Sequence, residues 1–201
     1  VWHSPAGANI YTSLILRPPI KTADAPQISL VAGVAVAELL EQFCPGRIEL
    51  KWPNDVLINS KKICGILAQM KTAGDQVDFV VVGIGINVNI RQDQFPVDIC
   101  DIATSLAIET GRDILRDDLI IRLYENFAKW YKKLLQDGFA SIKERWLCFA
   151  TMIGNNVKIS YFNETLTGKA LGIDNTGSLI LIDDNGKTIN ITAGEATILK
   201  E

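Results

Sequence analysis

Apolar and polar residues alternate over several short stretches in the first half of the chain. Residues 10–17 form a mostly apolar run that ends at Pro18-Pro19, which predicts a strand. Residues 47–52 alternate strictly, with an apolar face and a charged face. The charged face of this second predicted strand consists of Arg47, Glu49 and Lys51.

A predicted hairpin and a central strand follow. Residues 56–58 and 62–69 flank the turn residues Asn59-Ser60, and Gly74-Asp75 marks another turn. Residues 79–86 are almost all apolar, so we expect a central strand that is covered on both faces.

Helical spacing of apolar residues occurs in two regions of the chain. The region from Pro26 to Phe43 carries an apolar stripe with i, i+3 and i+4 spacing, and Asp24 is its expected N-cap. Residues 117–136 and 139–149 predict two more helices, separated by Gly138. No apolar run approaches the roughly 20 residues of a membrane-spanning helix, so we expect none.

After residue 150 the pattern becomes that of small β-domains. Short alternating stretches predict five strands, and Asp184-Asn185-Gly186 is a strong hairpin signal. The sequence therefore predicts an α+β domain over residues 1–150 and a small β-barrel over residues 151–201.

Composition narrows the possible functions. The chain has 201 residues, 48% of them hydrophobic, and a net charge of −3, which argues against disorder and against general binding of a phosphate backbone. Its single histidine excludes histidine-rich metal sites. Two disulfides are possible by number, but the apolar surroundings of Cys44, Cys64, Cys100 and Cys148 favour buried free thiols in a reducing cytosol.

The segment Lys51-Trp52-Pro53-Asn54-Asp55 has two interpretations. Pro, Asn and Asp are ordinary turn formers, and Lys51 fits the solvated face of a strand. Alternatively, a rigid turn fixes Lys51 at the mouth of a sheet, where its charge can neutralise a carboxylate or phosphate.

Glycines at the end of the predicted central strand suggest a second candidate site. Gly83 and Gly85 begin like a dinucleotide fingerprint, but neither a third glycine nor a helix follows, so a Rossmann site is disfavoured. Close packing of a neighbouring strand would explain these glycines equally well. Together with Gly65, they also suggest a flat slot in which a ligand lies against the backbone. Near the N-terminus, Trp2 is either a packing residue or a stacking wall for a base.

Taken together, these segments resemble the biotin–protein ligase family over essentially the whole chain. The matching segments are Trp2–Tyr11, Lys51–Asp55, Lys61–Leu67, Gly83–Asn89, Gly172–Asp174 and Gly194-Glu195. The resemblance implies an α+β catalytic domain with a mixed sheet, akin to class II aminoacyl-tRNA synthetases and lipoate ligases. A small Src-homology-3-like barrel is implied behind it.

The resemblance also implies the site residues. Lys51 matches the catalytic lysine that holds the biotin carboxylate and the α-phosphate. The implied biotin site contains Lys51, Gly65, Ile66, Leu67, Gly83, Gly85 and Ile86. The implied nucleotide site contains Trp2, Ser4, Tyr11, Asn54, Asp55 and Asn87. No metal-binding residue is implied, because Mg²⁺ would be held mainly by the oxygens of ATP.

The implied reaction makes biotinyl-5′-AMP from biotin and ATP and then acylates one lysine of a biotin carboxyl carrier protein. A homodimer and a cytoplasmic location are implied as well, and DNA binding only if an N-terminal domain precedes the chain. The family's Gly/Arg-rich loop would lie just upstream of Val1, so we expect residues before it and poor catalysis by this chain alone. A lipoate ligase and a non-catalytic biotin-responsive regulator remain as alternatives.

Overall fold

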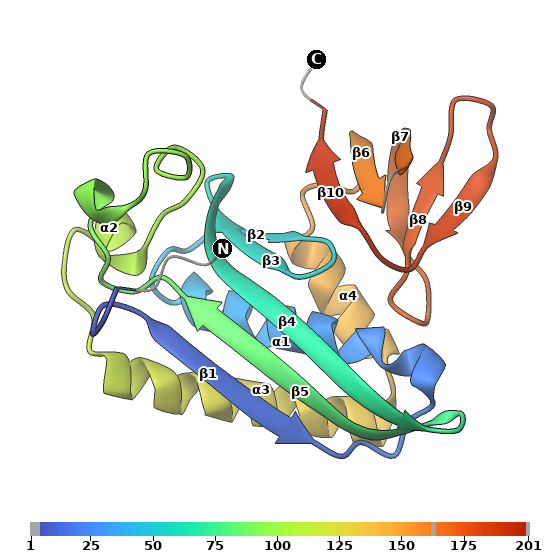
Figure 1. The fold of residues 1–201 in the computed structure, drawn as a ribbon, viewed down its shortest axis with the longest axis horizontal. Coiled ribbons are helices and arrows are strands. Elements are labelled where there is room, and N and C mark those ends of the chain that lie inside the picture. The colour runs from blue at the N-terminus through green and yellow to red at the C-terminus, as the bar shows by residue number, and fades with distance from the viewer. Residues whose placement is uncertain (1–4, 162–163, 200–201) are drawn as a thin grey trace.

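The first domain consists of a five-stranded sheet with helices on one face. In the computed structural model, which describes residues 5–161 and 164–199, this sheet has the order β1-β5-β4-β3-β2 (Figure 1). All pairs in this order are antiparallel, and an isolated bridge between Lys62 and Ala103 is parallel. The strands are β1 (Ile10–Leu16), β2 (Ile48–Lys51), β3 (Asp55–Ile58), β4 (Lys61–Ala73) and β5 (Gln76–Ile86).

Four α-helices complete this domain: α1 (Pro26–Glu41), α2 (Leu106–Thr110), α3 (Arg116–Asp137) and α4 (Ala140–Phe149). Short 3₁₀ helices occupy Thr22–Asp24 and Gln92–Gln94. Helix α1 lies against the sheet, and α3 and α4 pack on α1 (Figure 1). The predicted helices are confirmed within a few residues, but α2 was not predicted.

Two expectations about α1 need correction. Its N-cap is Ala25, because Asp24 belongs to the preceding 3₁₀ turn and accepts a 3.3 Å hydrogen bond from Gln27. Residues 22–41 are also long and apolar enough to cross a membrane, contrary to the expectation that no run approaches that length. In the fold, 72% of that stretch is buried, because α1 is the core helix of the first domain.

The carboxylate of Glu38 joins the three long helices. It accepts hydrogen bonds of 2.9 Å from Lys129 and Trp130 of α3 and from Arg145 of α4. Burial by itself raises the pKa of Glu38, but these three partners outweigh it and hold the pKa below its ordinary value.

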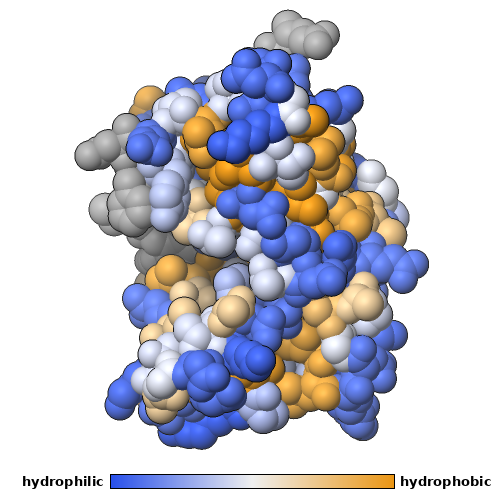
Figure 2. Space-filling view, turned by 90° about the vertical axis from the view of Figure 1, so that its right-hand side faces the viewer, coloured by the Kyte–Doolittle hydropathy of each residue, from blue (hydrophilic) through white to orange (hydrophobic). Residues whose placement is uncertain are grey.

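The second domain is a curled antiparallel sheet of order β10-β6-β7-β8-β9, which confirms the five predicted strands (Figure 1). They are β6 (Asn156–Tyr161), β7 (Glu164–Ile173), β8 (Leu179–Ile182), β9 (Thr188–Ile191) and β10 (Glu195–Ile198). The α+β class is confirmed. Figure 2 views the molecule from the right-hand side of Figure 1, where this domain lies, and shows two hydrophobic areas of surface with hydrophilic residues between them.

Two further sequence predictions are only partly correct. Strand β5 buries Val80, Val82 and Ile84 against the helices, but its other face is partly open, so the predicted double coverage is wrong. All four cysteines are free, as favoured, yet Cys100 is half-buried and Cys148 is exposed. Burial raises the pKa of the Cys64 thiol, which makes it unreactive.

Candidate functional site

Five residues selected from the sequence form one row across the whole sheet. Tyr11 pairs with Gly85, Gly85 with Gly65, Gly65 with Asp55, and Asp55 with Lys51. Residues directly opposite each other in antiparallel strands point to the same face. The two glycines therefore meet in the middle of the face that carries no helix, as the predicted slot requires.

A cavity of about 520 Å³ lies over these glycines. We refer to it as the sheet cavity, and its lining residues come from β1, β3, β4, β5 and the turn before β3. They are Tyr11, Thr12, Ser13, Asn54, Asp55, Lys62, Gly65, Ile66, Leu67, Gly83, Ile84 and Gly85. The structure thus brings together eight of the residues selected from the sequence and adds Thr12, Ser13, Lys62 and Ile84.

The predicted apolar residues of the slot divide between the two faces of the sheet. Leu67 lies on the open face and is 61% exposed. Ile66 points to α1, where a Cβ atom built on Gly33 would be 3.9 Å from Ile66 Cδ1. Ile86 is fully buried and is not among the described residues that line the cavity. Ile66 and Ile86 therefore support the floor from below.

A β-bulge turns Lys62 toward the sheet cavity. Val56 pairs with Cys64, but Leu57 pairs with Lys62, so Ile63 is the extra residue of β4. Beyond the bulge, Lys62 lies on the open face together with Leu57 and Gly65. Its Nζ atom is 2.6 Å from Oδ1 of Asp55, whose side chain is only 11% exposed.

Lys51, the predicted catalytic lysine, lies at the end of the same row but not among the described residues that line the cavity. Its Nζ atom is 3.5 Å from Oε1 of Glu195, at the start of β10 in the second domain. Lys62, and not Lys51, is thus among the described residues that line the sheet cavity. Lys62 was quoted as part of a matching segment, but no role was predicted for it.

The predicted nucleotide residues are spread more widely. Asn54 lines the cavity and donates a 2.8 Å hydrogen bond to the carbonyl of Ile66. Asn87 follows the end of β5, is buried and is not among the described residues that line the cavity; its amide donates to the carbonyl of Thr104 at 3.0 Å. Trp2 and Ser4 lie outside the described residues.

The segment that follows β5 folds back onto the backbone of Lys62. The amide of Lys62 donates to the carbonyl of Ile102 at 2.8 Å, and the amide of Thr104 donates to the carbonyl of Lys62 at 2.9 Å. Hydrogen bonds therefore fix the backbone of Lys62, and the ion pair with Asp55 fixes its ammonium group. The ammonium group is thus held in position before a ligand binds.

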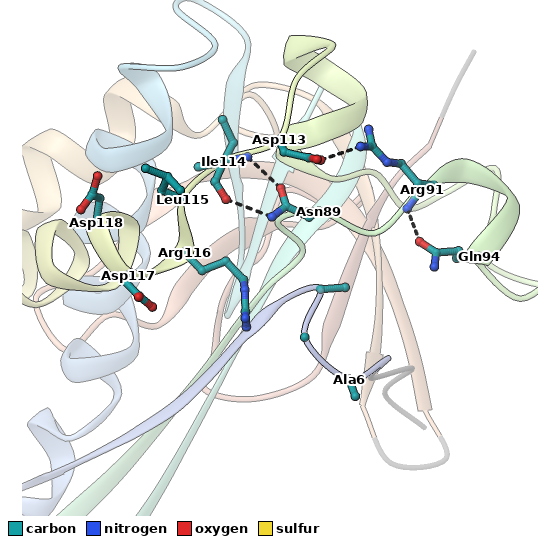
Figure 3. A pocket seen from close by; sticks show the side chains of 12 residues that line it. Ala6, Asn89, Arg91, Gln94, Asp113, Ile114, Leu115, Arg116, Asp117 and Asp118 are labelled. Carbon is teal, nitrogen blue, oxygen red and sulfur yellow. Dashed lines mark hydrogen bonds and ion pairs between the residues drawn. The ribbon is translucent and has the colours of Figure 1, made fainter.

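A second cavity of about 790 Å³, which we call the loop cavity, lies between residues 6–8, residues 89–94 and the start of α3 (Figure 3). Asn89 fixes this region with two 2.9 Å hydrogen bonds to the backbone of Ile114. The charged side chains are partly committed to each other: Arg91 pairs with Asp113 at 2.5 Å, and Arg116 donates to the carbonyl of Asn9. None of the residues predicted for the biotin or nucleotide site is among its described lining residues, although Ala6, Gly7, Ala8 and Asn89 belong to the matching segments.

Metal binding by the protein has no support in the described part of the chain. Among residues 5–161 and 164–199, no group of three or more His, Cys, Asp and Glu side chains could hold a metal ion. The described polar side chains that line the sheet cavity are the ammonium group of Lys62, the carboxylate of Asp55, the amide of Asn54 and the hydroxyls of Tyr11, Thr12 and Ser13.

Comparison with known proteins identifies this arrangement. Residues 1–148 match the Biotin/lipoate A/B protein ligase family, and residues 152–198 match the Biotin protein ligase C terminal domain. The chain belongs to the biotin protein ligase family. It is 35% identical over 191 residues to a biotin--[acetyl-CoA-carboxylase] ligase of Paracoccus denitrificans, with 94% of this chain and 79% of that protein covered.

Other biotin protein ligases extend the comparison. A bifunctional ligase/repressor BirA of Bacillus spizizenii is 45% identical over 186 residues, which cover 92% of this chain and 57% of that protein. The chain thus spans little more than half the length of that relative. The structure of the Aquifex aeolicus ligase with biotin and ATP superposes with a TM-score of 0.81 at 30% identity, covering 96% of this chain and 79% of that one.

Proposed function

We propose that the protein is a biotin–protein ligase that activates biotin with ATP and transfers it to a lysine of a biotin carboxyl carrier protein. The observation that carries the proposal is the sheet cavity, which is lined by the paired glycines Gly65 and Gly85 together with Lys62. The small bicyclic ring of biotin, with its carboxylate at the end of an alkyl chain, fits such a slot. The similarity to an Aquifex aeolicus ligase bound to biotin and ATP supports this choice of ligands.

The proposed reaction has two steps. A carboxylate oxygen of biotin attacks the α-phosphorus of ATP, and the bond to pyrophosphate breaks. The acceptor amine then attacks the carbonyl carbon of biotinyl-5′-AMP, and AMP leaves. Negative charge develops near the α-phosphate in the first step, so a fixed cation beside it lowers the barrier.

We assign this role to Lys62. It lines the cavity, and its backbone N–H and C=O groups form hydrogen bonds with Ile102 and Thr104. Its Nζ atom lies 2.6 Å from Oδ1 of Asp55. Lys51, which the family resemblance suggested, faces Glu195 of the second domain instead. Both lysines remain candidates for experiment, and the geometry favours Lys62.

The other residues divide by their places around the cavity. Gly65, Gly83 and Gly85 offer backbone to the biotin ring, and Leu67 covers it from the open face. Tyr11 lies on one side of these glycines and Asn54 and Asp55 on the other, and we assign all three to contacts with the nucleotide. Asn87, Trp2 and Ser4 belong to the same proposal. Mg²⁺ enters as part of the substrate, bound to the phosphates of ATP.

The acceptor is inferred from the relative whose name specifies acetyl-CoA carboxylase. A carrier domain of that enzyme would present its lysine above the open face of the sheet. We also propose a homodimer formed through exposed sheet edges, and sedimentation of the natural full-length protein with and without adenylate tests it. A monomer under both conditions would contradict this part.

Isotope exchange of labelled pyrophosphate into ATP tests the activity. The natural full-length protein is assayed with biotin, with lipoate and without either acid. Exchange that depends on biotin and not on lipoate is the expected result. Exchange with lipoate alone indicates a lipoate ligase, and biotin binding without any exchange indicates a non-catalytic regulator.

A further inference from the structure

The second domain contains the same turn twice. In Asp174–Ser178 and in Asp183–Lys187, the aspartate Oδ1 atom accepts hydrogen bonds from the amides two and four residues later, at 2.8–3.0 Å in both turns. The fourth residue is a glycine with positive φ in each case, +89° for Gly177 and +78° for Gly186. The two turns are therefore matched in backbone chemistry.

Their surroundings differ completely. The carbonyl of Gly177 accepts a 3.0 Å hydrogen bond from the indole of Trp52, and the carbonyl of Asn175 accepts one of 2.9 Å from Gln27 of α1. A Cβ atom built on Gly177 would lie 2.9 Å from Leu30 Cδ1. A Cβ atom on Gly186 would meet no described atom within 4 Å. Within the part of the chain that the structure describes, only the first turn is seen to contact the catalytic domain.

The docked turn is rigid for reasons that lie within the second domain. Oδ1 of Asp174 also accepts a bond from the Thr176 hydroxyl, and Oδ2 accepts one from Asn190. Burial by itself raises the pKa of Asp174, but the hydrogen bonds from Thr176, Gly177 and Ser178 outweigh it and lower the pKa. The carbonyl of Gly177 is thus presented to Trp52 in a fixed position.

Trp52 is connected to the sheet cavity through the residues that follow it in the chain. The Trp52 side chain is 2% exposed, Asn54 follows it in the turn between β2 and β3, and Asp55 is the first residue of β3. Asn54 forms two hydrogen bonds with the backbone of Ile66, of 2.8 and 2.9 Å. Asp55 holds Lys62. The position of Trp52 therefore fixes two residues that shape the cavity.

We propose that the turn Asp174–Ser178 is a positioning element for adenylate formation, acting through Trp52 on Asn54, Asp55 and Lys62. This inference rests on the proposed function. The element touches no substrate itself. It makes the catalytic geometry of the first domain depend on the seating of the second.

The matched turns provide the test. Gly177→Ala and Gly186→Ala introduce the same strained residue, but only the first pushes against Leu30. Biotin-dependent exchange is measured at saturating biotin and ATP in the natural full-length protein, with folding followed by circular dichroism. We expect Gly177→Ala to lower kcat at least tenfold and Gly186→Ala to leave it within twofold. Equal losses in the two variants overturn the proposal.

A second variant covers the case in which Gly177→Ala fails to fold. Trp52→Phe keeps an aromatic ring, but it removes the indole donor to Gly177 and makes the buried side chain smaller, so some loss of thermal stability is expected. At a temperature where circular dichroism shows the variant to be folded, we expect a fall in kcat of at least fivefold with the KM for biotin changed less than twofold. An unchanged kcat overturns the proposal. If the unchanged protein itself shows no exchange, the proposed function fails first.

Discussion

Lys62 and Asp55 form a 2.6 Å ion pair between β4 and β3, on the face of the sheet that carries the cavity. Asp55 also belongs to the row that contains Gly65 and Gly85. The pair therefore holds the ammonium group of Lys62 at the cavity lined by these glycines, where the group can bind the carboxylate of a ligand. Four predictions test this arrangement and the fold that supports it.

The floor of the sheet cavity can be filled without disturbing the helices. Gly85→Val adds a side chain on the open face, and β-branched residues suit strands. We expect biotin affinity, measured by titration calorimetry, to fall at least tenfold, with little change in thermal stability. Val81→Ile, on the same face of β5 but not among the described cavity residues, is the control and should bind biotin normally. Equal affinities for both variants would contradict the slot.

The Glu38 cluster should be a main support of the helical layer. Glu38→Gln removes the charge that Lys129, Trp130 and Arg145 share, and hydrogen bonds to charged groups contribute about 1.5–3 kcal/mol each. We expect a loss of about 2 kcal/mol or more in the free energy of unfolding, measured by urea denaturation. Glu125→Gln, an exposed glutamate of α3, should change it by less than about 0.5 kcal/mol.

The same residue predicts a dependence on pH. The pKa of Glu38 is held below its ordinary value of 4.5, so its contribution is complete above that pH and is lost as the pH falls through the lowered pKa. Between about pH 5 and pH 3, the unchanged protein should therefore lose more stability than Glu38→Gln. Parallel decreases in the two proteins would show that Glu38 is not responsible.

Much of the sheet could be predicted from alternation alone. Ile48, Leu50 and Trp52 are buried, as the pattern of residues 47–52 indicates. The facing glycines were also predictable, because Gly65 and Gly85 both sit in strands where a side chain is missing from a regular pattern. Strand β5 looked doubly covered because its exposed side also carries apolar residues.

Lys62 could not be assigned by the same method. Strict alternation puts it on the face of Cys64 and Ile66, which is the helix side, and the bulge at Ile63 reverses this. A bulge depends on the pairing of two strands, which a one-dimensional pattern does not record. Strand β2, which contains Lys51, pairs with β3 without a bulge, so alternation correctly predicts that Lys51 lies on the open face. For this reason the sequence pattern pointed to Lys51 and not to Lys62.

The contacts between the domains could not be predicted from the sequence either. Asn175-Thr176-Gly177 and Asp184-Asn185-Gly186 both read as turns, and their local chemistry does turn out to be the same. Only the three-dimensional structure shows that one of them docks on Trp52 and Gln27.

The central claim is that Lys62 supplies the charge for adenylate formation. Single-turnover formation of biotinyl-5′-AMP, measured in Lys62→Met and Lys51→Met of the natural full-length protein, tests it most directly. Loss of a preorganised charge contact costs about 3–4 kcal/mol, so Lys62→Met should react at least about 100-fold more slowly. Lys51→Met, which removes the contact with Glu195, should stay within about tenfold of the unchanged protein. The reverse order would contradict the account and return the catalytic role to Lys51.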